Sequence, residues 1–532
     1  KPFYNLMMFP YPSAEGLHVG NMYAFTGADI YGRAKRMQGY DVFEPIGLDG
    51  FGIHSENYAM KIGAHPASQA KVSEKRFYKQ MESIGNGFAW DEKVETYNPE
   101  YYKWTQWLFI QMFKKGLAYR KKAEVNWCTS CLTVLSDEQV ATEDGNHSTA
   151  LMARCERCGS AVIKKELEQW FFKITDYAEK LLKNLDTLDW SEKVKIAQRN
   201  WMGKSEGAEI TFALKDSGEL KVFTTRPDTI MGVTFIAVAH GSPYAGKIAL
   251  HPVTGAELPV YPTDYVVADY GTAAVMGVPA HDERDRAVAE AHGIYVSDAP
   301  LLPVDEALAK SSGKKETRFR LRDWLISRQR YWGPPIPMIH CPKCEWQPVP
   351  EDQLPVLLPR VKNFRPEGTG TSPLASVKSF YEATCPQCGG RARRETDVSD
   401  TFLDSSWYFL RYPDAKNAEK PFSDEIIKKW LPVNMYIGGA EHSVLHLLYS
   451  RFVTMALKDM GYVDFDEPFT VFRAHGLLIK EGAKMSKSKG NVINPDEYIE
   501  RYGADTLRMY LMFLAPFSQG GDFRDEAVMG IY

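Results

Sequence analysis

Residues 3–46 read FYNLMMFPYPSAEGLHVGNMYAFTGADIYGRAKRMQGYDVFEPI, and this stretch decides the fold. Residues 3–9 are a mostly apolar run typical of a buried strand, and the Pro- and Gly-containing residues 10–16 end it in a loop. A helix is predicted over residues 20–38, because apolar side chains recur every three residues, basic residues fill its last turns and a glycine follows. Residues 40–46 predict a second strand.

This order of strand, loop, helix and strand predicts the fold class. It is the first unit of an α/β domain with a doubly wound parallel sheet, in which ligands bind at the carboxyl ends of the strands. We therefore expect the site around residues 10–21 and Asp49.

Length and charge exclude several classes of protein. The chain has 532 residues, of which 44% are hydrophobic, so it can build the cores of three or four domains and is not a disordered chain. Its net charge of −4 excludes a histone-like basic binder.

The longest apolar stretch, around residues 436–457, is interrupted by charges, so we expect no membrane span. The start lacks a methionine and an apolar signal region, which indicates a trimmed or incomplete N-terminus.

The eight cysteines form four Cys-x-x-Cys pairs, an arrangement typical of metal sites. Consecutive pairs combine into two complete four-sulfur sets, for which we expect one structural Zn²⁺ each; buried or redox-active thiols are the alternative. The predicted ligands are Cys128, Cys131, Cys155 and Cys158, and then Cys341, Cys344, Cys385 and Cys388.

Changes in pattern along the chain indicate inserted modules. A polar stretch between the first two cysteine pairs is followed by a predicted helical segment over residues 167–185. Residues 207–289 alternate like strands, including residues 265–268, and indicate a separate β-rich domain. The α/β pattern returns over residues 401–517.

Two short motifs carry the chemistry. His18-Val19-Gly20-Asn21 stands where a loop enters a helix, a place where backbone N–H groups and a histidine can bind a phosphate. Residues 482–491 place three lysines between glycines, as a mobile clamp for a polyphosphate requires. Taken singly, each has an ordinary alternative, a turn histidine and a solvated charged loop.

Together the two motifs resemble the HIGH and KMSKS signatures of the class I aminoacyl-tRNA synthetases. Residues 322–333 (RDWLISRQRYWG) resemble a segment shared by the leucyl, isoleucyl and valyl members. The details are similar to the leucyl members in Met8–Pro12, Asp49, Phe51-Gly52, Glu56–Ala59, Asp404–Tyr408, Gly438–His442 and His446. The resemblance covers the whole chain.

The resemblance implies a Rossmann-type catalytic domain interrupted by three insertions. Its expected parts are the first catalytic half (1–127), a zinc insertion (128–160), a connecting helical segment (161–206), an editing domain (207–315), a return to the core (316–340), a second zinc insertion (341–392), the second catalytic half with the KMSKS loop (393–515), and the start of a helical tRNA-binding domain (516–532). We expect the rest of that last domain to be missing, and charging of tRNA to be weak as a result.

The resemblance also assigns residues to substrates. His18, Asn21, Lys484 and Lys487 would be catalytic, and ATP would contact these four together with Gly20, Gly439, Glu441 and His442. Leucine would contact Met8, Phe9, Tyr11, Asp49, Ser405, Tyr408 and His446. The family usually has a histidine where this chain has Asn21, which keeps a donor but cannot carry charge and so lowers the expected turnover.

The β-rich insertion resembles the family's editing domain. Its threonine-rich and acidic motifs would supply Thr224, Thr225, Arg226, Asp228, Thr229, Asp282 and Asp285, with Asp285 on the ammonium group of the mischarged amino acid. The insertion is shorter than usual after Gly241, because insertions expected of the family there are absent.

The expected enzyme activates leucine with ATP and Mg²⁺ and transfers it to tRNA(Leu), as a cytoplasmic monomer without membrane contact. A repurposed synthetase paralogue, which binds ATP, amino acid or tRNA without efficient charging, is the alternative that Asn21 and the short insertion favour.

Overall fold

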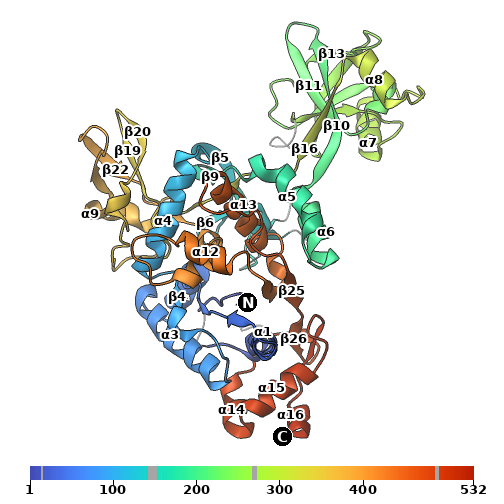
Figure 1. Cartoon of the computed structure of the whole chain (residues 1–532). Coiled ribbons are helices and arrows are strands. Elements are labelled where there is room, and N and C mark those ends of the chain that lie inside the picture. The colour runs from blue at the N-terminus through green and yellow to red at the C-terminus, as the bar shows by residue number, and fades with distance from the viewer. Residues whose placement is uncertain (13–15, 142–152, 157, 267–271, 486–490) are drawn as a thin grey trace. The chain divides into compact units, whose positions relative to one another are not determined.

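The computed structural model describes the whole chain except residues 13–15, 142–152, 157, 267–271 and 486–490 (Figure 1). The chain divides into two compact units. The first contains Lys1–Val140, Arg154–Gln198 and Asp323–Tyr532, and the second consists mainly of Arg199–Arg322. Within the described residues, no helix is long and apolar enough to cross a membrane.

A four-stranded parallel sheet with the order β2-β1-β24-β25 forms the centre of the first unit. Its strands are β1 (Pro2–Met7), β2 (Asp41–Phe43), β24 (Met435–Gly439) and β25 (Phe472–His475). The chain moves from β1 to β2 on one side and later adds β24 on the other side of β1. Ligands bind where strand order reverses in this way, so the carboxyl ends of β1 and β24 frame the site.

The first helix confirms the predicted strand, helix and strand order. Helix α1 (Val19–Met37) follows β1, and its buried Met22, Tyr23 and Phe25 share a core with the sheet and with α15 (Ala504–Phe513). Strand β2 is shorter than the predicted 40–46 and ends at Phe43. Pro45, two residues later, has no backbone N–H to donate to a sheet ladder.

The first unit contains further helices, and α6 runs from it into the second unit. They are α2 (Ile53–Lys61), α3 (Pro66–Ser83), α4 (Pro99–Lys114), α5 (Ala178–Asn184), α6 (Glu192–Met202), α9 (Lys378–Tyr381), α10 (Thr401–Ser405), α11 (Tyr408–Arg411), α12 (Asp424–Trp430), α13 (His446–Asp459), α14 (Pro495–Tyr502) and α16 (Asp525–Ile531).

The predicted helix over residues 167–185 is wrong in its first half. Strand β9 (Val162–Phe172) pairs antiparallel with β5 (Ala118–Cys128) along its whole length, and only Ala178–Asn184 form the helix α5. The aromatic end of β9, Trp170–Phe172, is buried. Pairing over eleven residues and burial of these rings outweigh the local helical pattern.

Both cysteine sets lie in small antiparallel sheets. In the first set, Cys128 ends β5 in a sheet of order β17-β9-β5-β6, with β6 at Thr133–Leu135 and β17 at Trp324–Leu325. Cys155 ends β8 (Arg154–Cys155), which pairs with β7 (Val140–Ala141) in a separate two-stranded sheet. The second lies in a sheet of order β20-β19-β22-β21, built from β19 (Met338–Cys341), β20 (Glu345–Pro348), β21 (Glu382–Thr384) and β22 (Arg391–Arg394).

The second unit is β-rich, as its alternating pattern predicts (green in Figure 1). Its sheet has the order β11-β10-β13-β14-β12-β15, and β16 pairs with the first part of β10, residues 204–209. The strands are β10 (Lys204–Leu214), β11 (Glu219–Thr224), β12 (Phe235–Val238), β13 (Ile248–Leu250), β14 (Glu257–Pro262), β15 (Ala274–Gly277) and β16 (Lys314–Phe319), and the helices are α7 (Glu283–His292) and α8 (Val304–Ser311).

One predicted strand of this unit is wrong as far as it is described. Tyr265 and Val266 form a turn, and the remaining residues 267–268 of that prediction lie outside the described residues. The Tyr265 hydroxyl donates a hydrogen bond to the carboxylate of Asp285. The turn allows this contact although Tyr265 is not paired in a strand.

Candidate active site

His18 caps the N-terminus of α1, directly after the loop that leaves β1. Its Nδ1 accepts a hydrogen bond from the Gly20 N–H at 3.0 Å, and its own backbone N–H donates to the Asn21 side-chain oxygen at 3.2 Å. Because Nδ1 is an acceptor here, the neutral ring carries its proton on Nε2. The ring packs against Gly20 so closely that a Cβ there would lie 2.8 Å from it.

Asn21 has a structural role that the motif alone does not reveal. Its carboxamide oxygen completes the reciprocal cap with His18 at the start of α1. A carboxamide makes this bond at any pH, whereas a protonated histidine at the same place could not accept it. Asn21 therefore fixes the start of α1 by a hydrogen bond that does not depend on pH.

A chain of buried aromatic side chains lies at the ends of β1 and β24. Phe9 stacks on Tyr408 with ring centroids 4.0 Å apart and planes 3° apart. The Tyr408 hydroxyl lies 2.9 Å from the Tyr436 hydroxyl, which lies 2.6 Å from Nε2 of His446. Burial lowers the pKa of His446 to about 3, so this histidine is neutral at physiological pH.

Tyr436 is the residue of this cluster that the sequence analysis missed. It lies on β24, two positions before Gly438, so the two residues share one face of the strand. Met8 lies against Gly438, where a Cβ would be 2.4 Å from the Met8 Cε. The short apolar run Met435–Ile437 before the glycine pair is the signal that could have identified this strand and its tyrosine.

Asp49 follows β3 (Gly47–Leu48), is fully buried, and lies close enough to Tyr408 for its charge to help raise the pKa of that hydroxyl, after the larger effect of burial. Its Oδ1 accepts hydrogen bonds from the hydroxyls of Thr96 and Thr401, at 3.2 and 3.3 Å. Its Oδ2 is buried and has no hydrogen-bond partner among the described residues. Burial, reinforced by the nearby Asp400, raises the pKa of Asp49 well above its usual value. A hydrogen-bond donor would satisfy this oxygen, and an ammonium group would in addition stabilise the ionised form of the carboxylate.

The other two predicted leucine contacts are Tyr11 and Ser405. The Tyr11 ring lies 6.4 Å from that of His54, at the start of α2. Ser405 is buried at the end of α10, where its hydroxyl donates to the Phe402 carbonyl of the same turn at 3.5 Å. Tyr11 lies close enough to Tyr436 to help raise the pKa of that hydroxyl, after the larger effect of burial. The role of Tyr11 and Ser405 as leucine contacts stays a prediction.

The predicted adenosine contacts follow β24 directly. Gly439 ends the strand, and the 3₁₀ turn η10 (Ala440–His442) carries Glu441 and His442. A Cβ at Gly439 would lie 2.4 Å from the Glu441 carboxyl carbon, so a larger residue there would force the end of the Glu441 side chain to move. Burial lowers the pKa of His442, whose ring lies 6.3 Å from that of His446.

Of the two predicted lysines, Lys484 ends the short strand β27 (Ala483–Lys484), which pairs with β26 (Leu477–Lys480). Lys487 lies outside the described residues. Their contact with phosphates therefore remains a prediction from the motif.

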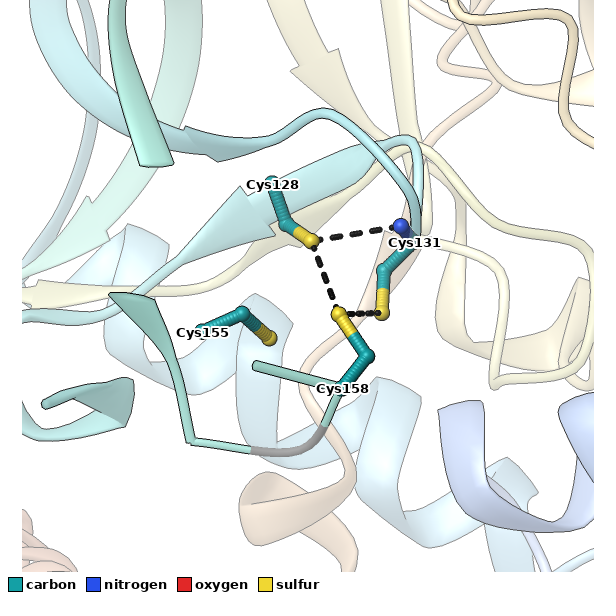
Figure 2. A group of neighbouring side chains, drawn as sticks. All are labelled: Cys128, Cys131, Cys155 and Cys158. Atoms are coloured by element: carbon teal, nitrogen blue, oxygen red, sulfur yellow. Dashed lines mark hydrogen bonds between the residues drawn. The ribbon is translucent and has the colours of Figure 1, made fainter. Parts of the chain in front are cut away.

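Four sulfurs meet in each predicted metal centre. In both sets all four Sγ atoms lie within 4.8 Å of one another, and Figure 2 shows the first set converging from two chain segments. The Cys128 and Cys158 sulfurs are 3.4 Å apart, and those of Cys341 and Cys388 are 3.6 Å apart. Zn–S bonds of about 2.3 Å in a tetrahedron place sulfurs roughly 3.8 Å apart, so both sets fit Zn²⁺.

A buried arginine joins the first metal loop to the active site. Arg330 donates to the Cys131 carbonyl at 2.5 Å and to the Asn57 side chain at 2.6 Å, and its Nε lies 3.3 Å from the Glu56 carboxylate. Glu56 also accepts from the Trp332 N–H at 3.1 Å. The segment around Arg330 thus holds helix α2, which begins four residues after Asp49.

The threonine-rich and acidic editing motifs lie close to each other in the second unit. Arg226 and Asp228 form an ion pair at 2.7 Å, which lowers the pKa of Asp228, and His281 beside the acidic motif lowers it further. The Thr229 hydroxyl donates to the Arg226 carbonyl at 2.7 Å. Thr224 accepts from the Arg226 N–H, whereas Thr225 is exposed.

The acidic motif opens helix α7. Asp282 caps the helix by accepting from the N–H groups of Arg284 and Asp285. Asp285 is buried, and accepts from the Tyr265 hydroxyl at 2.5 Å and the Val278 N–H at 2.8 Å. Burial raises its pKa. Tyr265 is a second contact that the sequence analysis missed.

Comparison with known families matches nearly the whole chain in three parts. The description "tRNA synthetases class I (I, L, M and V)" matches residues 315–523, "tRNA synthetases class I (M)" matches residues 7–215, and "Leucyl-tRNA synthetase, editing domain" matches residues 199–249 and 243–317. The editing-domain match is split at the place where the insertion was expected to be short.

Curated relatives agree with these families. A leucine–tRNA ligase of Clostridium perfringens is 47% identical over 99% of this chain and 72% of its own length, and one of Thermotoga maritima is 46% identical over 100% and 72%. The alignment with the first runs over 602 positions against the 532 residues of this chain, so that relative contains stretches without a counterpart here.

Solved structures agree as well. The chain is similar to the Agrobacterium radiobacter K84 agnB2 LeuRS in its ternary complex with tRNA and LeuAMS, with a TM-score of 0.91 and 38% identity over 99% of this chain and 71% of that one. A methionyl-tRNA synthetase of Mycobacterium tuberculosis shares the fold, with a TM-score of 0.54 and 18% identity.

Proposed function

This chain belongs to the leucine–tRNA ligases, class I enzymes that join leucine to its tRNA, and we propose which of its residues carry the reaction. The comparisons give no support to a repurposed paralogue. The observation that carries the assignment is the buried, unpartnered Oδ2 of Asp49 beside the Phe9 and Tyr408 stack. A carboxylate next to an apolar wall matches an amino acid with an ammonium group and an aliphatic side chain.

In the proposed first step, the leucine carboxylate attacks the α-phosphorus of ATP, and pyrophosphate leaves. Asp49 holds the ammonium group, and the rings of Phe9 and Tyr408 with Met8 exclude water from the aliphatic side chain. His18 donates its Nε2–H to a phosphate oxygen as negative charge grows there, and the N-terminus of α1 adds to that stabilisation. Catalysis then consists of positioning and electrostatic stabilisation, without covalent participation of the protein.

Other residues complete the proposed ATP site. Gly439, Glu441 and His442 take the adenosine side, while Lys484 and Lys487 neutralise the departing pyrophosphate. Mg²⁺ accompanies ATP as part of the substrate. These assignments rest on the motifs and on the position of η10 at the carboxyl end of β24.

The two cysteine sets would hold Zn²⁺ as structural ions. Each set offers four thiolates, so the ion would cross-link two chain segments and contribute to folding free energy. Arg330 connects the first set to α2, because it bonds both the Cys131 carbonyl and the Asn57 side chain.

The β-rich unit is proposed to hydrolyse mischarged tRNA. An apolar pocket separates side chains that differ by a methylene only about 10–200-fold, which makes a second, hydrolytic site useful. Asp285, held by Tyr265 and the Val278 N–H, would bind the ammonium group of the amino acid. We further propose, from the resemblance alone, that the enzyme works as a cytoplasmic monomer.

Amino-acid-dependent exchange between ATP and pyrophosphate tests the proposal. The purified chain is assayed with leucine, isoleucine, valine or methionine in turn, without tRNA. Leucine should give the highest kcat/KM. Faster exchange with any of the other three would overturn the assignment of the pocket, and the absence of exchange with all four would overturn the assignment of the reaction.

A further inference from the structure

A basic pocket lies away from the active site, at the far end of α2. It has a volume of about 620 Å³ and is bounded by Met60 and His65, around the α2–α3 connection, and by residues 360–365 of a later loop. Helix α2 separates it from the Asp49 loop by nine residues, or roughly 13 Å at 1.5 Å per residue. None of the proposed ATP and leucine contacts lines it.

The walls of this pocket are fixed by contacts across a large sequence separation. His65 donates from Nε2 to the Val361 carbonyl at 3.1 Å, and the Arg360 guanidinium donates to the Ser68 hydroxyl at 2.8 Å. The His65 ring packs edge-on against Phe364, with centroids 5.1 Å apart. The later loop is therefore bound to α3, and the cavity does not depend on a loose surface segment.

The rim of this pocket carries three exposed cations, Arg360, Lys362 and Arg365. Among the residues that the structure describes, no carboxylate forms an ion pair with any of them. Elsewhere on the same unit exposed lysines and arginines commonly pair with acids, as Lys114 does with Glu351. Three uncompensated cations on a chain of net charge −4 are a local concentration that favours an anion.

The lining supplies a second element of recognition. Met60, the His65 ring and the buried Phe364 give the pocket an apolar side next to the cations. Its volume lies in the range of about 300–1,000 Å³ that is typical of small-molecule sites and exceeds what a single inorganic phosphate needs. Arginine and lysine bind phosphate oxygens, while aromatic and apolar side chains take up the flat face of a base or a ribose.

We propose that this pocket binds a nucleotide unit, with its phosphate on Arg360, Lys362 and Arg365 and its ribose or base against Met60, His65 and Phe364. The unit has two possible sources, the backbone of bound RNA and a free mononucleotide. The RNA source rests on the proposed function, since it takes the RNA to be tRNA(Leu). The mononucleotide source does not.

The test compares the double variant Lys362→Glu/Arg365→Glu with the control Lys75→Glu/Lys79→Glu, which reverses two exposed lysines on α3 outside the pocket. Binding of a tRNA(Leu) transcript is measured over a range of KCl concentrations. Binding of AMP is measured after the active site has been filled with a leucyl-adenylate analogue. Leucine-dependent exchange without tRNA should be the same in both variants and the wild type, since neither variant touches the active site.

If the unit is part of RNA, the pocket variant binds the transcript at least tenfold more weakly than the control, and the slope of log affinity against log salt becomes shallower by between about 1 and 2. If it is a free mononucleotide, the variant loses AMP binding and keeps the transcript. Either result supports the pocket. Indistinguishable transcript and AMP binding in pocket variant and control would overturn it, whether or not the wild type catalyses exchange.

Discussion

The hydroxyl of Tyr436 lies 2.6 Å from Nε2 of His446, and this contact joins strand β24 to helix α13 inside the proposed leucine pocket. Both residues are buried, so neither can replace the lost bond with water. The relative orientation of the pocket walls therefore depends on this pair.

Replacing Tyr436 with Phe should weaken both folding and leucine binding. The change leaves the polar atoms of Tyr408 and His446 without a buried partner, which costs about 1–3 kcal/mol. We expect a lower unfolding midpoint and a several-fold higher KM for leucine in the exchange assay, with little change in the KM for ATP. Tyr462→Phe, which removes a hydroxyl bonded to Gln111 outside the pocket, is the control. Equal leucine KM values in the two variants would contradict the role of Tyr436.

His446 makes stability depend on pH. Its folded-state pKa is about 3, whereas a histidine in the unfolded chain titrates near 6.5. Between these values the unfolded state binds the extra proton, so the stability contribution is complete above about pH 6.5 and is lost as the pH falls toward 3. The non-titrating variant His446→Gln should lower this pH slope by up to about 1.4 kcal/mol per unit. Urea unfolding at pH 7, 6 and 5 measures the slope, and parallel curves for variant and wild type would contradict the burial of a neutral His446.

Arg330 should couple the first metal loop to the catalytic core. Metal analysis should give two zinc ions per wild-type chain. Arg330→Met leaves Glu56 buried without its cation, a change that costs about 3–5 kcal/mol, and removes the bond to the Cys131 carbonyl. We expect faster loss of one zinc ion to a chelator and slower exchange. Adding Glu56→Gln should recover part of the stability, while Arg501→Met, at an exposed position, should match the wild type. Unchanged zinc release in Arg330→Met would refute the coupling.

Asp285 should matter for editing and not for synthesis. Asp285→Ala removes the carboxylate that we place on the ammonium group of the mischarged amino acid, so hydrolysis of isoleucyl-tRNA(Leu) should fall on the order of 100-fold. Leucine-dependent exchange takes place in the other unit and should be unaffected. The exposed Asp264 provides the control variant, Asp264→Ala. Deacylation at the wild-type rate by Asp285→Ala would show that this carboxylate does not serve the hydrolytic site.

The sequence predicts the parts of the fold that depend on local pattern. The apolar run before His18 and the helix after it appear as β1 and α1, and the Cys-x-x-Cys spacing brings each set of four sulfurs together. Strand β9 was mistaken for a helix, because its pairing with β5 is a long-range interaction that a short window of sequence does not contain.

The same limit applies to the site. Motifs identify His18 and Asp49, but the contacts of Tyr436, Arg330 and Tyr265 join residues that lie far apart in the chain or across a turn. Their importance arises from buried hydrogen bonds, and a single sequence does not show which polar side chains are buried together. The paired role of Asn21 as a cap likewise became visible only from its bond to the His18 N–H.

The leucine KM of the Asp49→Asn variant in the exchange assay tests the central claim most directly. The variant keeps the size of the side chain and its place beside Thr96 and Thr401, and removes the charge that we assign to the leucine ammonium group. Loss of one partner of a buried charged pair costs about 2–5 kcal/mol, so the leucine KM should rise about 30-fold or more while the KM for ATP and the unfolding midpoint stay near the wild-type values. The exposed Asp41→Asn should match the wild type. A leucine KM for Asp49→Asn within about threefold of the wild-type value, far below the change expected from a cost of about 2–5 kcal/mol, would contradict the account.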